Sequence, residues 1–312
     1  MNPAQAHQQG LCVSLRELMG LRQPAARLAL SGQQVSQATL PGSRSSKRHG
    51  RGMDFDRLRP YQAGDDSRSI DWKVTARTGK PHSRVLREER DRPVLLLVEQ
   101  SSRLFFGSAL LLKSVLAAQA AALLGWRAMA QGERVGGLIL ADDGHQQVRP
   151  QGGKQSLLRL LYLLQAQNQA LTEKPAQSPQ PTHFCQALAG AGAILQPGAL
   201  VMLLCDERAL DPDAEKNLRL IAQQAELLLL PLHDPLDHRL PDAGLLGFGQ
   251  GQQHLQLDSH DPGLRLAYQR LAEQRTARWQ RLANTLDASL MPLHTAAPAL
   301  TQLYQQLRSA GR

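Results

Sequence analysis

The 312-residue sequence predicts a doubly wound α/β fold, in which helices cover both faces of a mostly parallel sheet. Several short runs are apolar throughout, as expected of strands that are buried on both faces. These runs alternate along the chain with longer helical patterns, which is the order that a parallel sheet requires. A hydrophobic content of 42% supports a sizeable core, and an aromatic content of 4% indicates that aliphatic side chains fill it.

The sequence predicts three parts, residues 1–49, 50–92 and 93–312. The first part is expected to hold one helix, Leu11–Leu30, which Pro24 breaks or kinks, and then a polar connector. The second part is rich in Arg and Asp and is expected to form short strands and turns. One helical turn is expected near Asp66–Ala76, and Asp65 or Asp66 is suited to cap it.

The third part carries the predicted sheet. The expected strands are Val94–Val98, Arg134–Ala141, His145–Arg149, Ala199–Cys205, Glu226–Leu232 and Ser289–Leu293. The expected helices are Ser108–Ala130, Ser156–Gln167, Thr182–Leu195, Asp211–Gln224, Pro262–Leu286 and Ala297–Arg308. The turn Asp142-Asp143-Gly144 predicts a hairpin, and a second hairpin is expected around Gly249–Gly251. In such sheets, ligands bind at the carboxyl ends of the strands.

Composition narrows the functional classes. Cys12, Cys185 and Cys205 show no metal-binding spacing, which indicates a reducing compartment. No signal peptide and no uninterrupted membrane span are visible, so a cytoplasmic protein is expected. The net charge of +9 is concentrated in residues 44–92, which hold fourteen Lys/Arg and eight Asp/Glu, a net of +6. Because the two signs are interleaved, internal pairing is favoured over an acidic partner.

The segment Gly50–Arg77 carries a dense set of residues at fixed spacing. The set comprises Gly50, Gly52, Asp54, Phe55, Leu58, Arg59, Tyr61, Gly64, Asp65, Asp66, Arg68, Ile70, Asp71, Trp72, Ala76 and Arg77. It resembles the signature of a bacterial family known as domain of unknown function fifty-eight. Relatives in that family are commonly encoded beside MoxR-type AAA+ ATPases, so the resemblance implies an adaptor or partner of such an ATPase. The sequence leaves open whether these residues bind a partner or stabilise the segment.

A second resemblance covers residues 93–293. An apolar strand, an acidic-Ser loop, a long helix and a Thr before a strand that ends in Asp are similar to the von Willebrand factor type A domain, which the same family carries. That resemblance implies a magnesium site, and the matching positions are Glu99, Ser101, Arg103, Thr182 and Asp206. Glu99 replaces an Asp, and Arg103 replaces a Ser hydroxyl with a guanidinium that repels cations. We therefore expect a degenerate, metal-free site in which Arg103 is the counter-ion of Glu99 or Asp206.

Other candidate sites are weaker. Asp65, Asp66 and Asp71 are expected to be caps and ion-pair partners, although a metal-dependent hydrolase using them is an alternative. Nucleic-acid binding through Arg44–Arg59 is a further alternative, and the low aromatic content argues against single-strand stacking surfaces. His233, His238 and His254 lack a partner at catalytic spacing and are expected at the surface, and Cys205 is expected to be a packed thiol.

The sequence therefore predicts a non-catalytic protein–protein interaction protein with no cofactor. Its predicted partner is a MoxR-type AAA+ ATPase acting in the assembly or maturation of other proteins.

Overall fold

The computed structural model describes residues 10–28, 53–61, 70–88, 92–173, 181–250 and 253–309. The chain forms two compact units. The larger unit comprises residues 1–43 and 92–312, and the smaller unit comprises residues 44–91. The N-terminal helix thus belongs to the larger unit, because Leu18 and Leu28 lie in its core.

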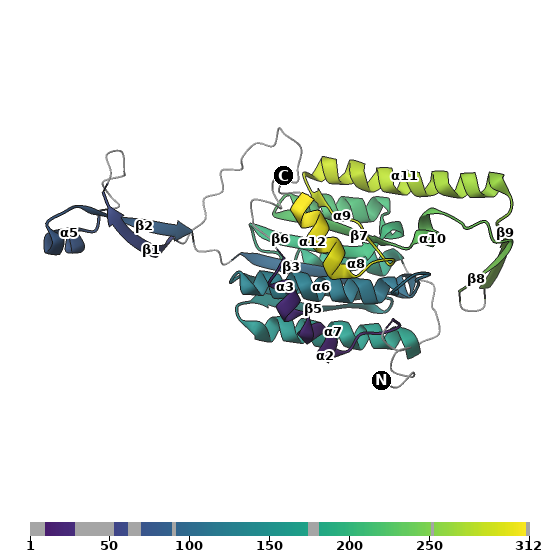
Figure 1. Ribbon diagram of the computed structural model, residues 1–312, viewed down its shortest axis with the longest axis horizontal. Helices are drawn as coiled ribbons and strands as arrows, with labels where there is room; N and C mark the ends of the chain where they lie inside the picture. Colours follow the sequence, from purple (N-terminus) through teal and green to yellow (C-terminus); the bar gives the residue numbers. More distant parts are fainter. Residues whose placement is uncertain are drawn as a thin grey trace. The chain divides into compact units, whose positions relative to one another are not determined.

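A seven-stranded sheet forms the centre of the larger unit (Figure 1). Its strands are β3 (Pro93–Glu99), β4 (Arg134–Ala141), β5 (Gly144–Gln151), β6 (Ala199–Asp206), β7 (Ala225–His233), β10 (Ser289–Leu290) and β11 (Leu293–His294). The order is β10-β7-β6-β3-β4-β5, with β11 also beside β7. All pairs are parallel except the β4–β5 hairpin, which confirms the hairpin predicted at Asp142–Gly144.

Helices cover both faces of this sheet. One face packs against α6 (Lys113–Ala130) and α7 (Lys154–Glu173), and α2 (Leu15–Gly20), α3 (Arg22–Ala25) and α12 (Ala299–Ser309) pack onto α6 within the same core. The other face packs against α8 (Pro181–Ala191), α9 (Pro212–Ala222) and α11 (Pro262–Leu286). Along β3, Leu96 and Val98 belong to the first core, whereas Leu95 and Leu97 belong to the second. This alternation confirms the doubly wound α/β fold.

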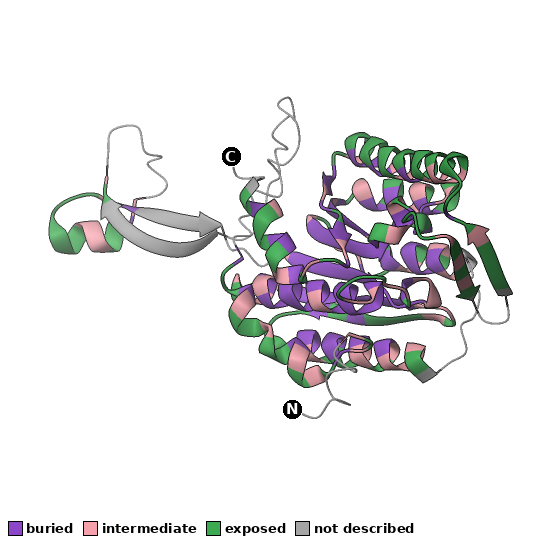
Figure 2. Ribbon diagram, turned by 45° about the vertical axis from the view of Figure 1, so that its right-hand side comes forward, coloured by how far each residue is buried: buried purple, intermediate pink, exposed green. Residues whose placement is uncertain are grey.

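Burial follows the same layers (Figure 2). The inner strands β3 and β6 are buried at every position, because both of their faces lie under helices. The outward side of α11 is largely exposed (Figure 2). No helix within the described part of the chain is long and apolar enough to cross a membrane.

One helix begins several residues later than predicted. The helix expected from Ser108 begins at Lys113, because backbone N–H groups of the preceding loop bond elsewhere. Leu110 N donates to the Thr295 carbonyl at 3.1 Å, and Leu112 N donates to the Gly10 carbonyl at 3.3 Å. These long-range bonds replace the local ones that a helix would need.

The expected helix Leu11–Leu30 is also divided. α2 ends at Gly20 and α3 begins at Arg22, so the break falls before Pro24. Pro24 lies in the first turn of α3, where its missing N–H has no helical partner to lose.

Two short helices and two short strand pairs complete the described α-helices and β-strands. In the larger unit, α10 (Pro235–His238) follows β7, and the hairpin of β8 (Leu245–Gln250) and β9 (Gln253–Asp258) confirms the one expected around Gly249–Gly251.

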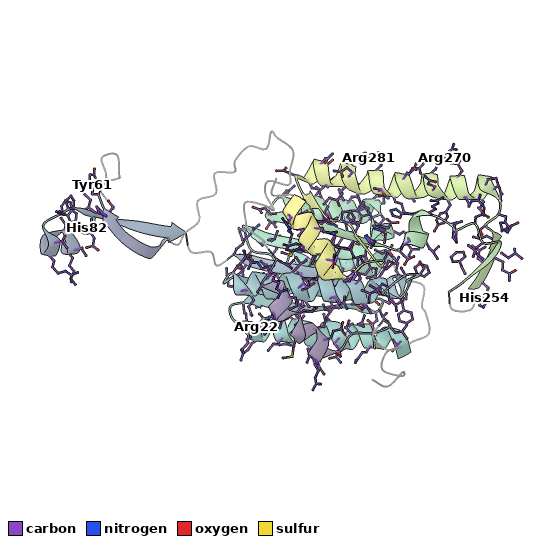
Figure 3. All side chains as sticks on the ribbon, viewed as in Figure 1. Arg22, Tyr61, His82, His254, Arg270 and Arg281 are labelled. Atoms are coloured by element: carbon purple, nitrogen blue, oxygen red, sulfur yellow. The ribbon has the colours of Figure 1, made fainter. Side chains whose placement is uncertain are left out.

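In the smaller unit, β1 (Met53–Pro60) pairs antiparallel with β2 (His82–Glu88), and Tyr61 N donates to the Pro81 carbonyl at 2.9 Å. Figure 3 labels Tyr61 and His82 at this end of the pair.

The helix of the smaller unit is α5 (Trp72–Thr78). Its N-cap is Asp71, whose carboxylate accepts from the backbone N–H groups of Lys73 and Val74, both at 3.1 Å. The predicted caps Asp65 and Asp66 lie outside the described residues. Gly79 ends α5 at φ 69°, in the left-handed region that glycine adopts without strain.

We predict that Asp71→Ala loosens α5 by about 1 kcal/mol, because both capped N–H groups lose their acceptor. Hydrogen exchange of the α5 amides should be about fivefold faster. Asp71→Asn, which keeps an acceptor oxygen, should retain most of the protection. Equal protection in the Ala variant would show that the cap does not stabilise α5.

Candidate functional site

The carboxyl ends of β3 and β6 meet at the topological switch point of the sheet. From β3 the chain crosses to β4 on one side and later returns to β6 on the other side. Such a reversal opens the crevice in which doubly wound folds bind ligands. Glu99 ends β3 and Asp206 ends β6, and the backbone N–H of Asp206 donates to Glu99 Oε2 at 2.8 Å.

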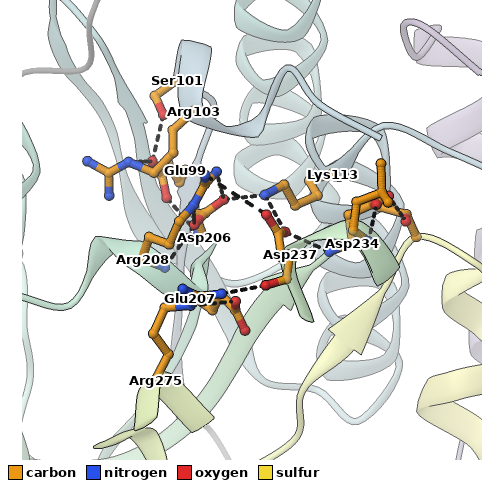
Figure 4. Close-up of polar contacts among 12 residues, drawn as sticks. Glu99, Ser101, Arg103, Lys113, Asp206, Glu207, Arg208, Asp234, Asp237 and Arg275 are labelled. Carbon is orange, nitrogen blue, oxygen red and sulfur yellow. Dashed lines mark hydrogen bonds and ion pairs between the residues drawn. The ribbon is translucent and has the colours of Figure 1, made fainter. Parts of the chain in front are cut away.

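Glu99 is held by the loop that follows its own strand (Figure 4). Ser101 Oγ donates to Glu99 Oε1 at 2.6 Å, and Arg103 Nε lies 3.9 Å from the same oxygen. The expected pairing of Arg103 with Glu99 is therefore present. Burial raises the pKa of Glu99; the Asp206 charge acts in the same direction, and Arg103 opposes it.

Lys113 is the central cation of the site, and its role was not predicted. Its side chain is 0% exposed, and its Nζ lies 2.6 Å from Asp206 Oδ2 and 2.9 Å from Asp237 Oδ2 (Figure 4). The Phe106 ring lies 5.4 Å from the same ammonium group. In the sequence, Lys113 only interrupts an apolar stretch, and nothing local indicates that it is an ion-pair partner.

Asp206 also forms an ion pair with a second cation, Arg208. Arg208 Nε lies 2.9 Å from Asp206 Oδ1, and the Arg208 backbone N–H donates to the same oxygen at 2.8 Å. Burial acts to raise the pKa of Asp206, but Lys113 and Arg208 outweigh it and lower the pKa to about 2. The expected counter-ion Arg103 thus pairs with Glu99, and Asp206 is neutralised by two cations that the sequence did not single out.

The short helix α10 connects this network to the apolar loop 105–112. Asp234 caps α10, and its carboxylate also accepts from the backbone N–H of Ser108 at 2.7 Å and from the Thr295 hydroxyl. Burial acts to raise the pKa of Asp234, yet these hydrogen bonds lower it. Asp237 Oδ2 accepts from the Asp234 N–H at 2.8 Å while it also binds Lys113. The loop, α10 and the start of α6 are therefore held by one set of contacts.

The residues present do not fit the magnesium site implied by the resemblance. A hard cation needs several oxygens that are free to coordinate it. The Ser101 hydroxyl instead donates to Glu99, and both Asp206 oxygens are bound by Lys113 or Arg208. Thr182 is the second residue of α8 rather than its N-cap, and its side chain lies outside the described residues.

Two histidines that have no partner at catalytic spacing in the sequence have neighbours in the fold. The rings of His233 and His238 stack at 4.3 Å between centroids, and His238 pairs with Glu207. His233 ends β7 and His238 ends α10, and the parallel pairing of β6 and β7 brings Glu207 beside them. Cys205 is buried, as predicted, and burial raises the pKa of its thiol.

Comparison with known proteins assigns the chain to a family. The family model described as Protein of unknown function DUF58 matches residues 57–278. The chain belongs to the DUF58 family. Proteins described as uncharacterized from Mycobacterium tuberculosis and Mycobacterium bovis are each 30% identical to it over 291 residues, covering 91% of this chain and 88% of theirs.

Two solved structures are similar to this DUF58 protein at low identity. One is described as conserved hypothetical protein BatB from Bacteroides thetaiotaomicron, with 10% identity, a TM-score of 0.43, and coverage of 70% of this chain and 98% of that chain. The other is described as an aerotolerance-related membrane protein from Bacteroides fragilis, with 12% identity, a TM-score of 0.43, and coverage of 70% and 99%.

Only some of the signature residues of this DUF58 protein lie within the described part of the chain. Asp54, Phe55 and Arg59 lie on β1, Tyr61 follows it, and Asp71, Trp72 and Arg77 belong to α5 and its cap. Gly50, Gly52, Gly64, Asp65, Asp66 and Arg68 lie outside the described residues. Trp72 is exposed, whereas Asp71 is used as a cap, so the described signature residues do not share one role.

We predict that Lys113→Met destabilises the larger unit by about 3–5 kcal/mol, because Asp206 and Asp237 stay buried without their shared cation. Denaturant unfolding measures this loss. Lys154→Met is the matched control, because Lys154 also begins a helix but is exposed. If the two variants are equally stable, the buried ammonium group is not a structural requirement.

A pH dependence follows from Asp206. Its pKa is about 2 in the folded chain and 3.8 in an ordinary setting, so its ionised form stabilises the fold above about pH 4. As the pH falls towards 2, about 2 kcal/mol should be lost. Asp206→Asn should be less stable at pH 7 and should lose less stability over that interval. Asp213→Asn, at an exposed position of α9, should follow the unmodified protein.

Proposed function

We propose that this DUF58 protein is a non-catalytic, cytoplasmic protein that interacts with another protein. We further propose that its larger unit is a von Willebrand factor type A-like domain. Its proposed partner is a MoxR-type AAA+ ATPase acting in protein assembly or maturation. The observation that carries the proposal is the carboxyl edge of the sheet, where side-chain cations bind the carboxylates. Lys113 and Arg208 form ion pairs with Asp206, and Arg103 forms an ion pair with Glu99. An edge neutralised in this way is suited to contact another protein surface.

An apolar loop beside this network supports the same role. Residues 105–112 connect the end of β3 to the start of α6 and therefore lie at the carboxyl edge. Within this loop Phe105 is 36% exposed and Leu110 is 54% exposed. Arg208, 45% exposed, is a further side chain of the edge. Aromatic and apolar side chains beside Arg are typical of the centre of protein interfaces.

The identity of the partner rests on the family resemblance found in the sequence. Relatives in the DUF58 family are commonly encoded beside MoxR-type ATPases, and genes that stay together often encode proteins that act together. The contacts at the carboxyl edge support the proposal of a binding surface, and the resemblance is the basis for the proposed class of partner.

We predict that Leu110→Glu weakens binding to the purified MoxR-type ATPase of the same genome at least about tenfold, because a charge replaces an apolar contact at the centre of the interface. Binding is measured by calorimetry or interferometry. Leu220→Glu is the matched control: Leu220 is 51% exposed and lies near the end of α9 that leads to the amino end of β7.

Two outcomes would count against the proposal. The unmodified protein could show no binding to the ATPase, or the Leu220 variant could lose binding as strongly as the Leu110 variant. Magnesium- or manganese-dependent hydrolysis of nucleotides or phosphodiesters, lost on Asp65→Asn, would instead favour a metal-dependent hydrolase.

A further inference from the structure

A second polar cluster lies beside the ion network, on Glu207, His233 and His238. Glu207 directly follows β6, His233 ends β7, and His238 ends α10. Because β6 and β7 are parallel neighbours, their carboxyl ends bring the three side chains together. One potential ligand atom from each residue lies within 4.8 Å of the other two.

The imidazoles of the cluster are partly exposed to solvent, and its carboxylate is buried. Glu207 is 5% exposed, whereas His233 and His238 are partly exposed. The two imidazole rings stack with 20° between their planes, and His238 Nε2 lies 2.7 Å from Glu207 Oε2. A solute can therefore reach the imidazoles from solvent, while the carboxylate forms the floor of the cluster.

The carboxylate of Glu207 is fixed in place by α11. Arg275 Nε donates to Glu207 Oε1 at 3.0 Å, and Trp279 Nε1 donates to the Glu207 backbone carbonyl at 2.8 Å. Arg275 also donates to the Asp237 carbonyl, which holds the guanidinium in its orientation. These contacts occupy one carboxylate oxygen and leave the other directed at His238. Outer contacts of this kind are what orient ligands in metal sites.

The surroundings of the two imidazoles shift their pKa values in opposite directions. Burial, assisted by the neighbouring His238, lowers the pKa of His233 to about 4, so its ring is neutral at pH 7 and can coordinate a metal. The hydrogen bond to Glu207 raises the pKa of His238, and burial and Arg275 oppose that rise. A proton between His238 and Glu207 is the group that a bound cation would displace.

We propose that Glu207, His233 and His238 bind a divalent transition-metal ion of the Zn²⁺ class. Two imidazoles and one carboxylate are a ligand set that suits Zn²⁺ and not Mg²⁺, which prefers oxygen ligands. Zn–N and Zn–O bonds of about 2.0–2.2 Å place the ligand atoms of a tetrahedral site roughly 3.4 Å apart. His238 Nε2 and Glu207 Oε2, which are 2.7 Å apart, would separate slightly, and more distant ligand atoms of the cluster, which lie within 4.8 Å, would approach one another. The partly exposed histidine rings can make that adjustment by side-chain rotation while Arg275 holds the carboxylate.

A third imidazole lies close to the cluster and could supply a fourth ligand. The ring centroid of His294, at the end of β11, is 5.9 Å from that of His233. Zinc sites take four ligands, and sites with three protein ligands leave one position to solvent or to another molecule. The inference is independent of the partner proposed above, because it uses neither the loop 105–112 nor the ATPase.

The test is a zinc titration of the chelator-treated full-length protein, followed with a competing chromophoric chelator at pH 7.5. We expect one Zn²⁺ to bind per chain, with affinity lowered at least about tenfold by His233→Ala and by His238→Ala. His294→Ala shows whether this third imidazole coordinates the ion. His254→Ala is the matched control, because His254 is an exposed imidazole on the β8–β9 hairpin (Figure 3).

Binding should also depend on pH and on the metal. Zn²⁺ affinity should fall as the pH is lowered, because protons compete with the ion for the imidazole nitrogens. Excess Mg²⁺ should not displace Zn²⁺.

Three results would overturn the inference. The protein could bind no stoichiometric zinc, the His233 and His238 variants could bind it as tightly as the unmodified protein, or the His254 variant could lose it equally. Circular dichroism of each variant separates a lost site from a lost fold. Because the titration contains no ATPase, its failure and a failure of the partner proposal are distinguishable.

Discussion

The ammonium group of Lys113 is buried between Asp206 and Asp237, and the arrangement of the carboxyl edge depends on it. A charge of this kind is stable in the interior only when it is paired and hydrogen-bonded. Lys113 begins α6, Asp206 ends β6, and Asp237 lies on α10, so one cation joins three elements that are distant in the sequence. The ends of these elements cannot move independently without separating buried charges.

The remaining contacts extend this constraint across the edge. Arg103 pairs with Glu99 after β3, and Arg275 on α11 pairs with Glu207 after β6. Each pair joins a strand end to a loop or a helix, so the polar groups form a fixed floor rather than an open acidic pocket. Ion pairs of this kind add little net stability compared with apolar packing. Their effect here is geometric, because they set where the loop 105–112 and α10 lie.

Local patterns predicted the fold well and the site only in part. The strand Arg134–Ala141 and the helix Pro262–Leu286 were predicted with their observed ends. The signals for them, an apolar run and an Asp-Pro helix start, consist of residues that are adjacent in the sequence. The predicted start of α6 was wrong because backbone N–H groups of the preceding loop donate to the carbonyls of Gly10 and Thr295. The role of Lys113 was missed because its partners lie 93 and 124 residues away, a separation that no spacing rule covers.

The consecutive residues Asp206 and Glu207 show how one strand end serves two clusters. Neighbouring side chains at the end of a strand point to opposite sides. Asp206 turns to Lys113, while Glu207 turns to His238 and Arg275. The four-residue helix α10 takes part in both clusters, because its Asp237 binds Lys113 and the adjacent His238 binds Glu207. A ligand or a proton that moves His238 therefore acts on the same short helix that holds Asp237 against the buried ammonium group.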